Sequence, residues 1–199
     1  MKEQGAALVL ALLVIVCLSG LGLGLVAAGN AERQIAANEL RAAATSLAAD
    51  AAIEGVLWEI AAAADWSALL SSATSNFHDA TRQPVTASRT ALDLEQVRAD
   101  IQSEASVTYA LGPDTPRWRL FAWGPLTRLA GLAADDSGAY VAVWLADDPA
   151  DADGLASADT NGTIMVHSEA FGFGATRRSA DVVIARAPAG VRVLSWRSH

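Results

Sequence analysis

Apolar residues are distributed unevenly along this 199-residue chain. Residues 4–31 contain no charged side chain, and residues 6–28 form an almost continuous apolar run. As a helix rising 1.5 Å per residue, that run is ~35 Å long, enough to cross a hydrocarbon core of ~30 Å. The pattern therefore predicts a membrane-spanning helix near the N-terminus.

The helical pattern continues beyond the apolar run. Residues 31–64 contain no proline and are rich in Ala, Glu, Arg and Leu, which favour helix. Ile53, Leu57, Ile60 and Ala64 recur at helical spacing, which predicts one buried face. We expect one helix with a transmembrane half (6–30) and an amphipathic half (31–64). The alternative is two helices that separate at Gly29-Asn30.

Residues 65–199 have the pattern of an α+β head. Residues 65–90 are polar and predict loop with at most one short helix, whereas residues 93–104 return to helical spacing after Asp93. Beyond them, short alternating segments predict antiparallel strands over residues 107–111, 118–123, 140–145, 163–171, 180–186 and 191–196. The expected fold class is α+β, with the long N-terminal helix packed on an antiparallel sheet.

Charge and composition exclude several classes of function. The chain has 14 Lys and Arg against 22 Asp and Glu, a net charge of −8, and thus no electrostatic footprint for nucleic acid. Its one cysteine, Cys17, excludes an intramolecular disulfide and a cysteine-based zinc cluster. The motifs of a nucleophile elbow, a phosphate-binding loop and a zinc protease are absent from the sequence. We therefore expect no catalytic residues, no metal and no cofactor.

Acidic residues are concentrated in residues 135–159, where no basic residue occurs. The stretch Asp151-Ala152-Asp153-Gly154 resembles part of a calcium loop, but the first ligand position of that pattern falls on Pro149. We interpret residues 147–159 as a solvated acidic loop, with calcium binding as the alternative. His167 is interpreted as a packed strand residue, and most of the six tryptophans as core residues.

The first five residues bear on the kind of membrane segment. A secretory signal peptide would be cleaved after Val26-Ala27-Ala28, but this apolar run is long for such a signal and only Lys2 precedes it as a basic residue. The polar leader Met1-Lys2-Glu3-Gln4-Gly5 instead runs directly into the apolar segment. This junction resembles the class III signal of type IV pilins and pseudopilins. The resemblance implies that prepilin peptidase removes residues 1–5 after Gly5 and that the new N-terminal amine, on Ala6, is methylated.

The residue at position 10, Leu10, narrows the resemblance to particular groups of pilin-like proteins. Most pilins carry glutamate at this fifth mature position, and its absence is typical of PilX-like minor pilins and of K-type minor pseudopilins. Residues 5–54 resemble PilX-type pilus assembly proteins, and so does the C-terminal third, which has an Asn161-Gly162 turn, an Arg177-Arg178 pair and a closing Ser195-Trp196-Arg197. Together these stretches cover about half of the chain.

The resemblance implies a single-pass inner-membrane protein of a Gram-negative bacterium, with residues 65–199 as its periplasmic head. Such a protein assembles with other minor pilins and the major pilin to prime or cap a type IV pilus, by helix packing and not by catalysis. One alternative is a K-type minor pseudopilin of type II secretion, a family that usually carries a larger inserted domain. Another is a periplasmic enzyme with a conventional signal peptide.

Overall fold

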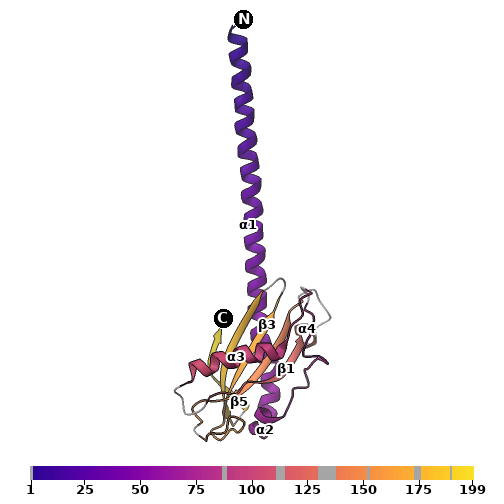
Figure 1. Ribbon diagram of the computed structural model, residues 1–199, viewed down its shortest axis with the longest axis vertical. Helices are drawn as coiled ribbons and strands as arrows, with labels where there is room; N and C mark the ends of the chain where they lie inside the picture. The colour runs from indigo at the N-terminus through magenta and orange to yellow at the C-terminus, as the bar shows by residue number, and fades with distance from the viewer. Residues whose placement is uncertain are drawn as a thin grey trace. The chain divides into compact units, whose positions relative to one another are not determined.

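The computed structural model describes residues 2–86, 89–110, 115–129, 138–151, 153–172, 176–188 and 190–199. Two compact units make up the chain, Met1–Leu40 and Arg41–His199. The elements, most of them labelled in Figure 1, are in chain order α1 (Lys2–Ala62), α2 (Trp66–Ser71), α3 (Leu94–Thr108), β1 (Arg119–Pro125), α4 (Leu126–Leu129), β2 (Tyr140–Asp147), β3 (Thr163–Phe171), β4 (Arg177–Ala187) and β5 (Gly190–Ser198).

The helix α1 passes through Gly29 and Asn30 without interruption, so the two-helix alternative is wrong. From Arg41 onward α1 belongs to the second unit, and one face of this part of the helix lies in the core of that unit. The buried positions recur three or four residues apart, as helical geometry requires: Thr45, Ala48, Ala49, Ala52, Ile53, Val56 and Ile60. The predicted stripe is thus correct at Ile53 and Ile60. However, Leu57 is only partly buried, and Ala64 lies exposed beyond the end of the helix.

The strands form one antiparallel sheet in the order β1-β2-β3-β4-β5, so each strand pairs with its neighbours in sequence. This arrangement confirms the expected meander, and β3 has the bounds predicted for it. The Gly190 position, at positive φ, begins β5 after the short connection from β4. Because each connection joins adjacent antiparallel strands, the topology needs no crossover.

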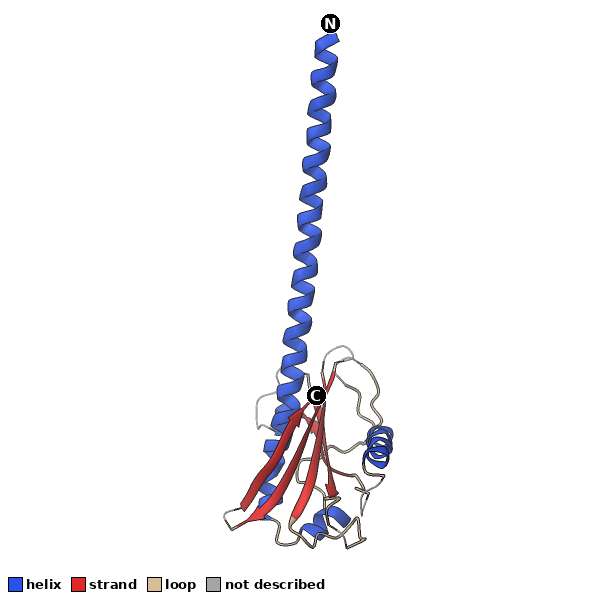
Figure 2. Cartoon of the chain, turned by 90° about the vertical axis from the view of Figure 1, so that its left-hand side faces the viewer, coloured by secondary structure: helices blue, strands red, loops and turns tan. Residues whose placement is uncertain are grey.

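Helices cover both faces of the sheet (Figure 2). The residues of α1 from Ala48 to Ile60 pack on one face, against side chains that include Val143, Val166 and Ile184. On the other face, α3 packs against side chains that include Trp144 and Met165. As a result β2 is buried at every position, and its eight residues do not alternate between core and solvent.

The strand predicted over residues 107–111 is wrong within the described residues 107–110, because α3 continues to Thr108. Leu94, Val97 and Ile101 are followed at helical spacing by Ala105, and all four are buried. Val107, which favoured a strand locally, is 78% exposed. The helical face of α3 therefore extends one turn further than the sequence indicated, and Asp93 caps its start by accepting hydrogen bonds from the backbone N–H groups of Glu95 and Gln96.

Candidate functional site

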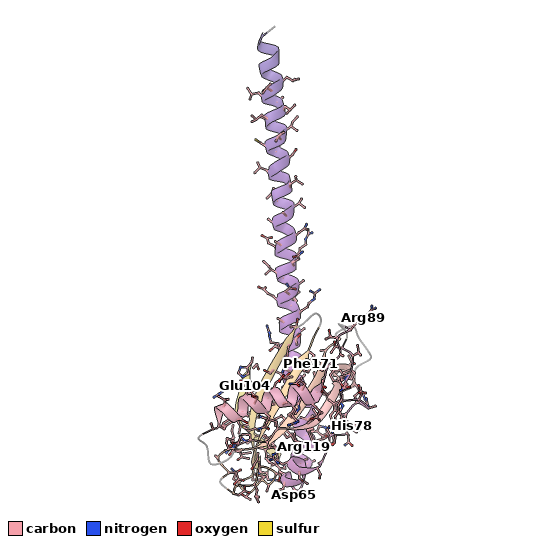
Figure 3. The ribbon with its side chains drawn as sticks, in the orientation of Figure 1. Asp65, His78, Arg89, Glu104, Arg119 and Phe171 are labelled. Carbon is pink, nitrogen blue, oxygen red and sulfur yellow. The ribbon has the colours of Figure 1, made fainter. Side chains whose placement is uncertain are left out.

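The first unit is a helical segment that is apolar on all sides between Leu8 and Val26. Large apolar side chains between Leu8 and Val26 are each at least 46% exposed, and they project around the whole helix (Figure 3). Among the described residues, α1 is the one helix long and apolar enough to cross a membrane. A helix with this pattern is stable in lipid or among similar helices, because water would contact apolar side chains on every side.

The predicted processing residues fall at the start of this helix. Gly5 and Ala6 lie within α1, and their side chains are outside the described part of the structure. Leu10 is 65% exposed and lies in the apolar segment. At this position an apolar side chain suits lipid, whereas a carboxylate would require a partner.

Polar contacts join the second half of α1 to the sheet. The buried Ser168 hydroxyl, in the middle of β3, donates a hydrogen bond to the Ala49 carbonyl oxygen, with 2.8 Å between the oxygens. The Asp50 Oδ1 atom accepts hydrogen bonds from Trp196 Nε1 at 3.0 Å and from Ser198 Oγ at 2.9 Å, both on β5. These contacts fix α1 against the sheet at its centre and at its edge strand. The sequence contained no signal for either contact.

The tryptophans divide between core and surface. Four of them are buried, as expected: Trp66, Trp118, Trp123 and Trp144. Trp196 is half-buried at its contact with Asp50. Trp58 is 68% exposed on α1, so the expectation that most of the tryptophans are core residues is confirmed with Trp58 outside the core.

A charged cluster lies on the α3 side of the sheet around His167. Its Nδ1 atom is 2.7 Å from Asp181 Oδ1 on β4, and its Nε2 atom is 3.3 Å from Glu169 Oε1 on β3. Burial by itself lowers the pKa of His167, but the hydrogen bonds and charges of the two carboxylates outweigh it and raise that pKa to about 9. His167 is therefore a packed strand residue, as predicted, and it carries a positive charge at neutral pH.

Glu169 has a second partner in this cluster. Its carboxylate, 3% exposed, accepts a pair of hydrogen bonds from Arg177, each 2.6 Å long. That bidentate contact raises the pKa of the Arg177 guanidinium. The Arg177 guanidinium also lies over the Phe171 ring, 5.6 Å from its centroid. The cluster balances its charges internally, since two acids face one imidazolium and one guanidinium, which is typical of a structural network.

An acidic cluster lies where β2 ends. Carboxylate oxygens of Asp147, Asp151 and Asp159 all lie within 4.8 Å of one another. Asp147 is 2% exposed and Asp151 is 4% exposed, so the interpretation of this loop as solvated is wrong at both residues. Burial raises the pKa of Asp147 to about 7 despite the hydrogen bond from the Asp148 backbone, and the charges of Asp151, Asp159 and Asp153 add to the rise.

The other two carboxylates of the acidic cluster are tied to the next turn. Hydrogen bonds from the Thr160 hydroxyl and backbone hold the pKa of Asp151 below its usual value. Asp159 Oδ1 accepts from the backbone N–H groups of Gly162 and Thr163, at 2.7 and 3.1 Å, but burial raises its pKa. Three carboxylates in this arrangement have the donor chemistry of a hard-cation site. The sequence pattern placed Asp147 in the acidic loop after a strand that ended at residue 145, whereas Asp147 is the buried last residue of β2.

The predicted processing residues Gly5 and Ala6 lie in the other unit of the chain. No protein-family model, no curated protein and no solved structure matches this chain.

Proposed function

We propose that this chain is a PilX-like minor pilin, which assembles with other minor pilins to prime or cap a type IV pilus. The observation that carries the proposal is that α1 has two parts with different surroundings. One uninterrupted helix is apolar on all sides over its first part and supplies a core face to the second unit over its last part.

A helix that combines an apolar part with a core-forming part suits the assembly of subunits in a membrane. An apolar helix that is retained in lipid can pack sideways against similar helices of neighbouring subunits. The same helix continues as a core element of the head, so one element would serve both the membrane and the head. A cleaved secretory signal has no need of such continuity, since it is removed before the mature protein works.

The proposal places the chain in the inner membrane with its head in the periplasm. Lys2, before the apolar segment, favours a cytoplasmic N-terminus. Prepilin peptidase would then cut after Gly5 on the cytoplasmic side. Other minor pilins and the major pilin would contact the apolar face of the mature helix.

The test is N-terminal sequencing and mass measurement of the membrane-inserted protein, in cells that contain prepilin peptidase. We expect wild-type protein to begin at a methylated Ala6, and Gly5→Leu to remain inserted with its leader intact. Gly29→Leu is the matched control, because it changes a glycine of the same helix and should mature normally. A wild-type N-terminus at Gly29 would instead identify a secreted protein with a conventional signal peptide. Normal maturation of Gly5→Leu would show that the cleavage site is wrong.

A K-type minor pseudopilin is the second candidate, since Leu10 suits it equally. A photo-crosslinker in place of Leu13, which is 59% exposed on the apolar helix, separates the two. Crosslinks to pilus subunits support the minor pilin, and crosslinks to type II secretion pseudopilins support the alternative.

A further inference from the structure

The acidic cluster combines residues from two places in the chain. Asp147 is the last residue of β2, and Asp151 and Asp159 come from the connection between β2 and β3. Since β3 returns antiparallel to β2, this connection folds back over the end of β2. Three carboxylate oxygens consequently lie within 4.8 Å of one another.

A second observation concerns the Asp147 side chain itself. Its Oδ1 atom accepts a hydrogen bond from the Asp148 backbone N–H at 3.0 Å. Its Oδ2 atom is buried and has no hydrogen-bond partner among the described residues, although Asp147 is only 2% exposed. Buried carboxylate oxygens are almost always paired, so an unpaired one beside two further carboxylates points to a cation as its partner.

Asp153 repeats this observation at the side of the cluster. Its Oδ1 atom accepts a hydrogen bond from the Leu155 backbone N–H at 2.7 Å, whereas its Oδ2 atom is buried without a partner among the described residues. Its negative charge acts on Asp147, together with those of Asp151 and Asp159. Asp153 therefore adds negative charge near the three clustered carboxylates.

The remaining contacts hold the carboxylates in position. Asp151 accepts hydrogen bonds from the Thr160 hydroxyl at 2.6 Å, from the Thr160 backbone at 2.7 Å and from the Asn161 backbone at 3.1 Å. Each carboxylate oxygen has two lone pairs, so these hydrogen bonds leave capacity for a metal. Arg186 compensates part of the charge of Asp159, but the charges that act on Asp147 are all negative.

We propose that Asp147, Asp151 and Asp159, with Asp153 beside them, bind one Ca²⁺ ion. Calcium binds oxygen ligands at about 2.3–2.6 Å, so two of its ligands can be at most about 5 Å apart. The observed limit of 4.8 Å satisfies that condition for each pair of oxygens, and three oxygens at that limit would have to approach one another slightly to bind one ion. Mg²⁺, with ligands at about 2.0–2.1 Å, requires oxygens no more than about 4.2 Å apart and strict octahedral geometry. The site does not depend on the proposed function of the chain.

Calorimetry on the full chain in detergent micelles, stripped of metal with EDTA and dialysed, tests this site. Titration with CaCl₂ should give one site with a Kd of about 10⁻⁴–10⁻³ M, the range of extracellular calcium modules. Asp147→Asn should weaken calcium binding at least tenfold. That factor corresponds to a loss of about 1.4 kcal/mol of binding free energy, which we take as the least that one ligand contributes. Asp148→Asn is the matched control, because it removes the same charge one residue away, from a side chain that instead accepts from Asn161 Nδ2. It should change the Kd by less than about threefold.

Thermal unfolding in EDTA shows whether the variants are folded. Removal of one charge from a repelling cluster should leave the midpoint of Asp147→Asn at or above that of the wild type. CaCl₂ should raise the midpoints of the wild type and Asp148→Asn by similar amounts and that of Asp147→Asn much less. If Asp147→Asn does not fold, Asp159→Asn replaces it with the same expectation. Three outcomes would overturn the proposal. The first is the absence of saturable calcium binding. The second is equal weakening of calcium binding by Asp147→Asn and Asp148→Asn, which would indicate a diffuse acidic surface. The third is binding of MgCl₂ as tight as that of CaCl₂.

Discussion

At the scale of single residues, one glycine sets how closely the end of β3 approaches α1. Gly172 follows β3, and a Cβ atom there would overlap the Thr45 hydroxyl of α1. Thr45 is 3% exposed and donates a hydrogen bond to the Arg41 carbonyl oxygen, so it has little room to move. This close contact lies entirely within the second unit.

Gly172→Ala should therefore destabilise the protein by about 1–3 kcal/mol through overpacking. Thr45→Ala removes the hydroxyl and should relieve most of that clash. Chemical denaturation of the wild type, the two single variants and the double variant measures the coupling between the two changes. We expect the double variant to be more stable than the sum of the two single effects predicts, by about 1 kcal/mol or more. Simple additivity of the two single changes would show that the contact does not limit the packing.

His167 makes stability depend on pH. Its pKa in the folded protein, about 9, lies above the ordinary histidine value of 6.5, so its contribution to stability is complete below about pH 6.5 and is lost as pH rises through about 9. The groups that face it are Asp181, which also contacts His199, and Glu169.

We expect wild-type protein to lose on the order of 2 kcal/mol more than His167→Gln between pH 6.5 and 9.5, measured by denaturant unfolding. The difference between the two proteins removes the effect of Asp147, which titrates near pH 7. His78→Gln is the control, because His78 contacts the Ser75 carbonyl oxygen and lies outside this cluster. Parallel pH profiles of wild type and His167→Gln would refute the assignment of a charged His167.

Leu10 leads to a prediction about position in the filament. In the proposed mature protein, the Ala6 amine is an ammonium in hydrocarbon, which costs ~3 kcal/mol or more unless it is paired. With Leu10 the chain offers an amine but no carboxylate to a neighbour, so we expect it at the first-assembled tip. Leu10→Glu should spread label along sheared pili. Uniform labelling of pili by the wild-type protein would contradict a tip position.

At the scale of elements, the contact of α1 with the edge strand β5 depends on one carboxylate. Asp50 accepts hydrogen bonds from both Trp196 and Ser198, and among the described residues no strand pairs with the outer edge of β5. Asp50→Ala should cost about 1–3 kcal/mol, because the half-buried indole N–H loses its acceptor. Glu54→Ala, an exposed position one turn along the same helix, should change the unfolding midpoint little. Equal midpoints for the two variants would show that Asp50 does not anchor β5.

At the scale of the whole chain, the boundary of the foldable part lies inside α1. The second unit begins at Arg41, and its core includes α1 residues from Ala48 to Ile60. A fragment of residues 31–199 should therefore be soluble, monomeric and cooperatively unfolding. A fragment of residues 65–199, which lacks that part of the core, should not unfold cooperatively. Circular dichroism and thermal melts of the two fragments test this, and cooperative unfolding of the shorter one would contradict it.

Local pattern was sufficient for most elements of this fold. The apolar run, the uninterrupted helix and the bounds of β3 follow from side-chain period and composition, because these decide which surface each segment must bury. The same reasoning failed at residues 107–110, where Val107 favours a strand. The helix continues there instead, because Ala105 is buried against the face of the sheet that α3 covers. That contact joins residues that are distant in sequence.

The polar sites required the tertiary structure, since their members are distant in sequence. The β3–β4 register places His167 directly opposite Asp181, and the turn of the chain after β2 brings Asp147 near Asp159. A sequence shows how many carboxylates a loop contains, but not which of them lose water on folding. Only the packed structure shows that Asp147 is buried with an unpaired oxygen, because burial depends on both layers that cover the sheet.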